Sequence, residues 1–164
     1  MSEQDRTEHD GRADFDFFIG RWKQQHRRLR ERLVGSNDWE EAGGMLVVRK
    51  ILGGLGNFEE GTLERESGVV QVMTVRLFDP HMREWSLYWA DSANGWSWSL
   101  PQIGAFKDGR GEFYAHEPFG GKHIFTRFFW TPLTASTCRW EQAFSADGGN
   151  TWETNWITEH TRIE

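Results

Sequence analysis

The feature that most constrains this chain is a steady succession of short strand-like segments separated by turns, with no long helical pattern. The predicted strands after the first are residues 39–52, 58–65, 69–78, 83–91, 96–106, 111–119 and 122–130, followed by a hairpin over 137–162. Turn sequences such as ESG, DPHM, SANG and ADGGN stand between them. About ten short strands without a linker predict an all-β fold, and we expect one antiparallel up-and-down barrel of about eight to ten strands.

Length, charge and cysteine content narrow the class of protein. The 164 residues suit one domain, which we place at residues 14–164 behind a polar, disordered tail over residues 1–13. A net charge of −6 argues against a nucleic-acid partner. Cys138 is the only cysteine, which excludes an intrachain disulfide, and no apolar run has the length of a membrane span. We therefore expect a cytoplasmic protein with no nucleic-acid or membrane partner, as a monomer or a homodimer.

The final hairpin predicts which side chains face the interior. Aligning Phe144 with Trp152 across the ADGGN turn puts Trp140 opposite Trp156, and antiparallel partners share a face. The predicted inner row continues through Thr158 and His160. The predicted outer face carries Arg139, Glu141, Glu153, Asn155 and Glu159. Because 10 of the 164 residues are Trp, such an interior either fills itself with rings or lines a cavity for a flat ligand.

Two further hairpins are predicted in the middle of the chain. Around DPHM, pairing Leu77 with Trp85 aligns Met73 with Trp89 in an inward apolar row. Around the GG turn at 120–121, pairing Phe119 with Lys122 sorts the next two strands into two faces. The second of these faces holds Tyr114, His116, His123, Phe125 and Arg127. This face is either solvated surface or a metal or anion site, although no third zinc ligand stands nearby.

The segment over residues 22–33 fits either a strand or a helix, and the strand-rich context favours a strand. A strand with Trp22 inward also points His26 inward, where it would offer a hydrogen-bond donor or a general base. The alternative leaves His26 on a charged outer strand. Trp22 follows Gly20 closely and is large enough to close one end of a barrel.

Three stretches carry a resemblance to a known family: FDFFIGRW, LFDPHMREWSLYW and WEQAFSADGGNTWETNW. Together they resemble a bacterial family of unknown function with a calycin-like, lipocalin-type barrel, and GRW at 20–22 is similar to the lipocalin Gly-x-Trp. The resemblance implies the fold over residues 14–162 and no catalytic residue. SADGGNTW, residues 145–152, is also similar to the Asp-box turn of sialidase propellers, and one copy implies only a hairpin whose loop Asp147 caps.

These patterns predict a small-molecule binding protein that holds an apolar or aromatic ligand inside the barrel. The candidate ligand-binding residues are His26, Trp85, Trp89, Trp140, Trp156, Thr158 and His160. We expect no metal and no cofactor. A second hypothesis is a cofactor-independent enzyme of the cyclase, isomerase or dehydratase type that uses His26 or His160 as acid and base. A third is haem binding through His160, since haem-binding barrels of the nitrobindin type also combine Gly-x-Trp with a histidine in a late strand.

Overall fold

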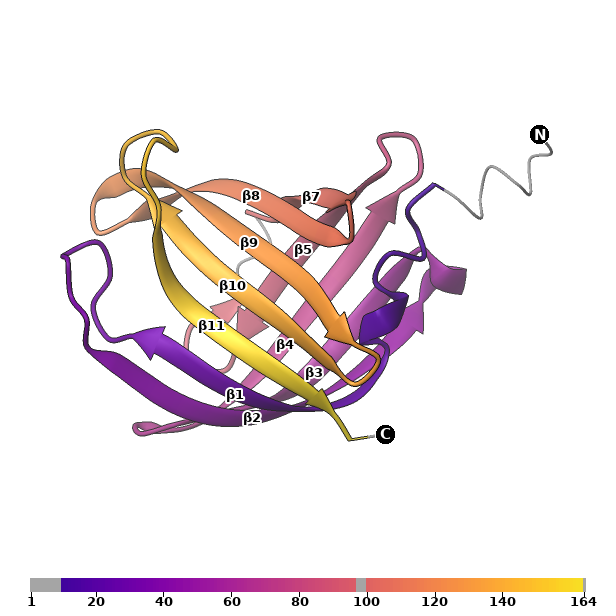
Figure 1. Ribbon diagram of the computed structural model, residues 1–164, viewed down its shortest axis with the longest axis horizontal. Coiled ribbons are helices and arrows are strands. Elements are labelled where there is room, and N and C mark those ends of the chain that lie inside the picture. The colour runs from indigo at the N-terminus through magenta and orange to yellow at the C-terminus, as the bar shows by residue number, and fades with distance from the viewer. Residues whose placement is uncertain (1–9, 97–99, 164) are drawn as a thin grey trace.

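A computed structural model describes residues 10–96 and 100–163, and it is an antiparallel barrel closed by pairing between β4 and β5 (Figure 1). The strands are β1 (Gly20–Leu29), β2 (Trp39–Ile51), β3 (Gly56–Arg65), β4 (Gly68–Asp79), β5 (Glu84–Asp91), β6 (Gly95–Trp96), β7 (Gln102–Lys107), β8 (Arg110–Phe119), β9 (Lys122–Thr134), β10 (Thr137–Ser145) and β11 (Glu153–Arg162). Each strand pairs with its neighbours in the sequence, except that β7 pairs with β5 past the short β6, and β1 pairs with β11. The predicted up-and-down barrel is therefore confirmed.

Helical structure is limited to two 3-10 turns, η1 (Asp16–Phe18) and η2 (Leu52–Gly54), among the residues that the structure describes. Neither of these turns has the length and apolar character that a helix needs to cross a membrane. Of the segment predicted over residues 22–33, the part up to Leu29 is a strand, as favoured from the sequence, and its side chains largely alternate between buried and exposed. Residues 30–33 lie in the loop that follows. The strand predicted over 96–106 is interrupted: β6 ends at Trp96, β7 begins at Gln102, and residues 97–99 lie outside the described residues.

Aromatic rings close one end of the barrel. The segment containing η1 lies across this end in Figure 1. Its Phe15 and Phe18 are buried in the core, where Phe18 stacks on Trp22 with ring centroids 5.4 Å apart. The Trp22 indole donates to Phe18 O at 2.9 Å. The Arg162 guanidinium lies 4.3 Å from the centre of the Trp22 ring and donates to two backbone carbonyls of the same segment. The predicted closure near Trp22 is confirmed, with two phenylalanines as its main additional parts.

The predicted N-terminal tail is only partly covered by the structure. Residues 1–9 lie outside the described part of the chain, whereas residues 10–13 contact the barrel. Asp10 is buried and pairs with Arg12 at 2.8 Å, and Gly11 O accepts a hydrogen bond from the Trp85 indole at 3.3 Å. Gly11 therefore contacts the barrel, because its carbonyl satisfies the buried Trp85 indole donor.

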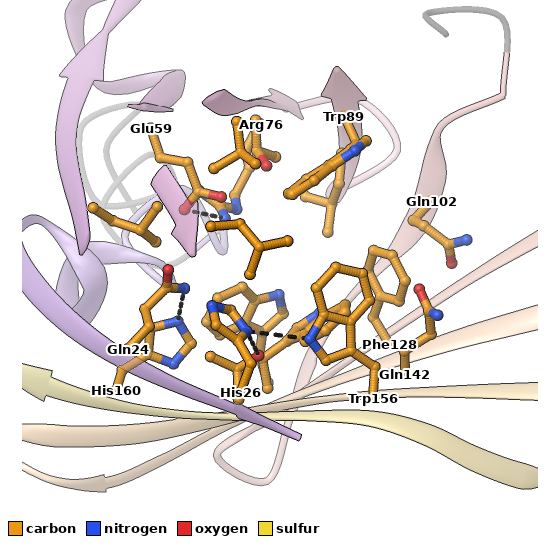
Figure 2. A pocket seen from close by; sticks show the side chains of 18 of the residues that line it. Gln24, His26, Glu59, Arg76, Trp89, Gln102, Phe128, Gln142, Trp156 and His160 are labelled. Atoms are coloured by element: carbon orange, nitrogen blue, oxygen red, sulfur yellow. Dashed lines mark hydrogen bonds and ion pairs between the residues drawn. The ribbon is translucent and has the colours of Figure 1, made fainter. Parts of the chain in front are cut away.

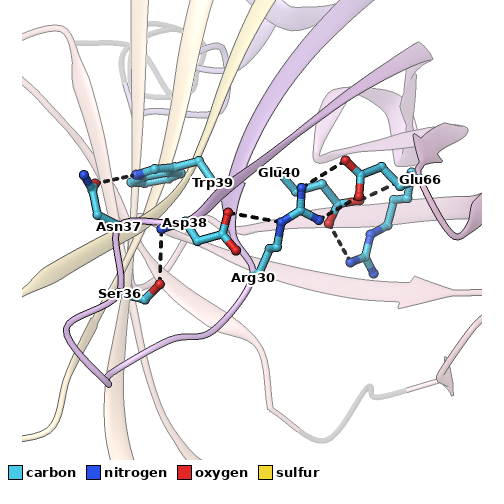
Figure 3. A network of polar contacts seen from close by, with 8 residues as sticks. Arg30, Ser36, Asn37, Asp38, Trp39, Glu40 and Glu66 are labelled. Atoms are coloured by element: carbon cyan, nitrogen blue, oxygen red, sulfur yellow. Dashed lines mark hydrogen bonds and ion pairs between the residues drawn. The ribbon is translucent and has the colours of Figure 1, made fainter.

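The opposite end of the barrel is bordered by charged loops. Figure 3 shows Arg30, from the loop after β1, donating to Glu66 in the β3–β4 turn at 2.7 and 2.9 Å and to Asp38 at 3.3 Å. Arg65 of β3 pairs with the buried Glu40 of β2 at 2.9 Å. These contacts join two neighbouring hairpin turns at this end through charged side chains.

The β4–β5 hairpin differs from its prediction. The observed partners are Phe78 with Trp85 and Arg76 with Leu87, one residue away from the predicted pairing of Leu77 with Trp85. Because side chains alternate, a shift of one residue exchanges the faces of β4. Its buried row consists of Val72, Thr74, Arg76 and Phe78, and Met73, Val75 and Leu77 are only partly buried. The expected inward row of β4 was wrong, although Trp85 and Leu87 of β5 are buried as predicted.

The β10–β11 hairpin contains a bulge between Gln142 and Ala143. On the side of the bulge away from the turn, Trp140 is opposite Thr158 and Gln142 is opposite Trp156, a shift of two residues that keeps the predicted faces. Between the bulge and the turn the shift is one residue, and Phe144 is opposite Glu153 instead of Trp152. Asn155, expected outside, is fully buried at this irregularity, and the outward assignment was wrong for this residue.

Trp152 precedes β11 and packs outside the barrel, with its ring 4.3 Å from the Arg127 guanidinium. It was predicted to continue the inner face, and this too was wrong. Asp147 caps the turn as predicted: it accepts from Thr151 N at 2.9 Å and holds Ser145 Oγ at 2.8 Å. The hydroxyl and amide donors around it lower its pKa to about 2.

Candidate functional site

The middle of the barrel contains a cavity of about 250 Å³ (Figure 2). Its aromatic lining residues are Trp89, Phe128, Trp130, Trp140 and Trp156, and its aliphatic lining residues are Leu46, Leu63, Val72, Leu87 and Leu100. Trp89 and Leu100 are 39% and 44% exposed, which places the opening of the cavity beside them. The other rings are buried or partly buried, and a few polar groups stand among them. This combination of apolar surface with a few polar groups is typical of small-molecule sites.

Six of the seven candidate residues line this cavity. His26 comes from β1, Trp89 from β5, Trp140 from β10, and the remaining three from β11, namely Trp156, Thr158 and His160. Trp85 does not line it. Its ring packs edge-on against Phe15 in the closed end, with the ring centroids 5.0 Å apart. Trp85 stands at the start of β5, and the cavity-lining Leu87 and Trp89 follow it at successive inward positions further along the strand. Trp85 is therefore a core residue, and the prediction that it contacts a ligand is not supported by its position.

His26 is held by two residues of the neighbouring strand β11. Its Nδ1 lies 2.8 Å from Thr158 Oγ1 and 3.1 Å from the Trp156 indole nitrogen. The indole N–H can only donate, so Nδ1 is the acceptor and the ring proton of neutral His26 is on Nε2. His26 is only 5% exposed, and burial together with nearby Arg28 lowers its pKa to about 4. Nε2 has no hydrogen-bond partner within residues 10–96 and 100–163.

His160 lies one step deeper and is more enclosed. Its Nε2 is 3.0 Å from Gln24 Nε2, and its ring is surrounded by Phe18, Trp22 and Trp130 at centroid distances of 5.1, 6.2 and 5.5 Å. Burial is the main cause that lowers the pKa of His160 to about 3. The imidazole is therefore neutral at physiological pH and forms part of the wall between the cavity and the closed end.

A buried ion pair stands in the same wall and was not anticipated from the sequence. Arg76 is 1% exposed, and its guanidinium lies 2.9 Å from Glu59 Oε2 and donates to Asn57 Oδ1 at 2.9 Å. The same guanidinium lies 5.2 Å from the centres of the Phe15, Phe18 and Trp130 rings. The Glu59 carboxylate thus compensates the buried charge of Arg76, and the aromatic faces stabilise the guanidinium further.

Two side-chain amides complete the polar lining near the other wall (Figure 2). Gln102 donates to Thr126 Oγ1, and its buried Oε1 has no hydrogen-bond partner among the residues that the structure describes. Gln142 donates to Asn155 Oδ1 at 3.0 Å. Glutamine in a predicted strand gives no binding signal of its own. The alternation that turns Trp22, His26 and Trp140 inward also turns Gln24 and Gln142 inward, whereas nothing in the sequence singled out Gln102.

The histidines of the β8–β9 hairpin lie elsewhere. Phe119 pairs with Lys122 as predicted, and His116 and His123 lie on the outer face with ring centroids 5.3 Å apart. In the described ranges 10–96 and 100–163, His, Cys, Asp and Glu side chains form no group of three that could hold a metal ion. Arg127 is the cation of the suggested anion site. Its guanidinium lies 4.2 Å from the centre of the Phe129 ring and 4.3 Å from the centre of the Trp152 ring, so aromatic rings contact it.

Comparison with known proteins supports the fold and gives no family. No protein-family model matches the sequence, and no curated protein sequence matches it. Among solved structures, the chain is similar to an S-type phycobiliprotein lyase from Guillardia theta, with a TM-score of 0.62 and 12% identity. The match covers 100% of this chain and 98% of that chain. The similarity therefore shows a shared barrel fold over the whole length.

Proposed function

We propose that this protein binds a small, mostly apolar or aromatic molecule in the cavity of its barrel. The observation that carries the proposal is that the cavity combines exposed and half-buried indole faces with buried polar atoms that have no hydrogen-bond partner among the described residues, His26 Nε2 and Gln102 Oε1 among them. Buried polar groups without partners cost folding free energy unless something else satisfies them. A ligand in this space would gain contact with Trp89, Trp140 and Trp156 and would satisfy these atoms.

Binding is a better match to the geometry than catalysis by the cavity histidines. A general base works best when its pKa is near the working pH. His26 and His160 have pKa values lowered to about 4 and about 3, so both are weak bases at neutral pH. The geometry also gives no support to haem ligation by His160, because its Nε2 lies against Gln24 and aromatic rings enclose it.

Two matched tryptophan variants test the proposal with the uncharged fluorescent probe N-phenyl-1-naphthylamine. Trp156→Ala removes an indole from the cavity, and Trp152→Ala removes an indole that packs outside the barrel. We expect probe fluorescence to rise on binding to the wild-type protein, and Trp156→Ala to weaken the affinity by about tenfold or more, since aromatic contacts dominate such sites. Trp152→Ala should change it by less than about twofold. Equal losses in both variants, or no binding by the wild type, would contradict the proposal.

A further inference from the structure

The hydrogen-bond arrangement around His26 determines what kind of polar group the cavity can accept. Trp156 Nε1 and Thr158 Oγ1 both lie within hydrogen-bond distance of His26 Nδ1, at 3.1 and 2.8 Å. An indole N–H has no acceptor capacity, so the neutral imidazole must carry its proton on Nε2. His26 therefore presents an N–H donor that is buried, lies on a cavity-lining side chain and has no acceptor in the part of the chain that the structure describes.

Glycine at position 44 makes the space next to this donor. Gly44 of β2 faces Gln24 of β1 in the register, and a Cβ atom added there would lie 3.1 Å from His26 Nε2 and 2.9 Å from Gln24 Oε1. It would also lie 2.6 Å from Thr62 O, closer than side-chain carbon atoms approach a backbone oxygen. A larger residue at this position would crowd Nε2, so the glycine keeps the donor side of His26 open.

The charged side chains that line the cavity do not provide a free cation for an anionic ligand. They are Arg76, Glu59 and Glu117, and Arg76 is already paired with Glu59 at 2.9 Å. Arg28 lies over the Trp156 ring at 4.7 Å and is not part of the cavity lining. An unpaired carboxylate would enter a desolvated space whose described lining has no free cationic side chain to contact it, which is costly.

We infer that the ligand is an uncharged aromatic compound with a carbonyl group, whose oxygen accepts a hydrogen bond from His26 Nε2 while its ring contacts the cavity tryptophans. This inference rests on the proposed binding function and specifies its ligand class. It requires an acceptor on the ligand, and it disfavours both a hydrocarbon of the same shape and a carboxylate.

Equilibrium dialysis with three naphthalenes of similar shape tests the inference: 2-acetylnaphthalene, 2-ethylnaphthalene and 2-naphthoate. We expect the ketone to bind the wild-type protein about 3- to 10-fold more tightly than 2-ethylnaphthalene, as for one net hydrogen bond. His26→Leu should remove this preference, and His26→Gln, which keeps an amide donor, should retain part of it. Weaker binding of 2-naphthoate than of the ketone is also expected.

The outcomes separate this inference from the function on which it rests. Equal affinities for the ketone and 2-ethylnaphthalene would overturn the carbonyl inference while leaving aromatic binding intact, and tighter binding of 2-naphthoate would replace it with an acid ligand. Binding of none of the three would contradict the proposed function itself. Since His26→Leu could fail to fold, ¹⁵N spectra of wild-type histidines provide a second measurement. The Nε2 signal of His26 should shift with 2-acetylnaphthalene and not with 2-ethylnaphthalene, and an unshifted signal with bound ketone would overturn the inference.

Discussion

The closed end and the middle of this barrel are built from the same alternation of inward and outward side chains, but the inward positions are packed solid at the closed end and leave a cavity in the middle. At the closed end, the N-terminal segment adds Phe15 and Phe18 to the rings of Trp22, Trp85 and Phe113, and all five side chains are at most 2% exposed. In the middle, the inward positions carry His26, Gln102 and Arg76 among indoles, and a cavity remains. The difference arises because an added segment of chain fills one half, whereas nothing in the described residues fills the other.

This contrast indicates where stability and function reside. Dense packing at the closed end contributes stability, because every ring there has contacts on all sides. Buried polar atoms without partners in the middle reduce stability, and such sacrifices are typical of binding sites. Substitutions at the closed end should therefore lower the free energy of unfolding most, and substitutions at the opening of the cavity least. The opposite result would contradict the comparison.

The largest effect is expected from Phe18→Ala at the closed end. Phe18 is fully buried and contacts the rings of Trp22, Trp130 and His160, so its removal leaves a cavity that the rigid barrel cannot collapse to fill. We expect the free energy of unfolding to fall by about 4 to 5 kcal/mol. Urea denaturation measures this value, and a loss below about 1 kcal/mol would show that the plug does not carry the stability.

The second prediction compares a buried ion pair with an exposed one. Glu59→Leu leaves Arg76 buried without its carboxylate, and we expect a loss of about 3 to 4 kcal/mol. Glu159→Leu removes the partner of Arg139, a pair 2.6 Å apart but half-exposed on the outer face, and should cost less than about 1 kcal/mol. Similar losses in the two variants, measured by urea denaturation, would mean that Arg76 has access to water in the cavity.

The third prediction concerns pH. The folded-state pKa values of His26 and His160 are lowered to about 4 and about 3, so these histidines take up protons in the unfolded chain before they do so in the folded protein. Stability is therefore full above pH 6.5 and decreases as the pH falls towards these values. Between pH 7 and pH 5 each histidine should account for a loss of about 2 kcal/mol.

Urea unfolding at the two pH values measures this dependence, and the double variant His26→Gln, His160→Gln is its control. Burial raises the pKa of Glu117, which acts in the opposite direction in both proteins, so the difference between them isolates the histidines. An identical pH dependence in wild type and variant would show that the histidines are charged in the folded state.

The smallest effect is expected at the opening of the cavity. Trp89 is 39% exposed, and its ring lies 6.3 Å from the Trp156 ring. Trp89→Ala should lower the free energy of unfolding by about 1 kcal/mol or less, because solvent already reaches the site. A loss as large as that of Phe18→Ala would show that the middle of the barrel is packed as tightly as its closed end.

The fold could be predicted because alternation and turn chemistry are local signals. Phe119, Gly120, Gly121 and Lys122 form a tight turn with positive φ at both glycines, and that hairpin was paired correctly. The β4–β5 register was missed because Arg83, at a φ of 56°, ends a turn whose length the letters DPHM do not reveal. The bulge at Gln142 was missed for the same reason: one extra residue leaves no mark in the local pattern.

The candidate site was only half accessible from sequence. Large aromatic residues at alternating positions indicate an interior whichever register is chosen, so Trp140 and Trp156 were placed correctly. The predicted inward row through Met73 and Leu77 left Arg76 on the other face of its strand, and the observed register reverses this. The burial of Arg76 depends on Glu59 and Asn57 of the adjacent strand and on rings from distant parts of the chain, and sequence reading has no access to such contacts.

The central claim is that a ligand occupies the middle of the barrel and leaves the closed end unchanged. The indole N–H signals of ¹⁵N-labelled protein, assigned by single substitution, report on both regions during titration with 2-acetylnaphthalene. Signals of Trp89, Trp140 and Trp156 should shift, and those of Trp22, Trp85 and Trp152 should stay in place. Shifts confined to Trp152, or no shift in any cavity tryptophan at saturating concentration, would contradict the account.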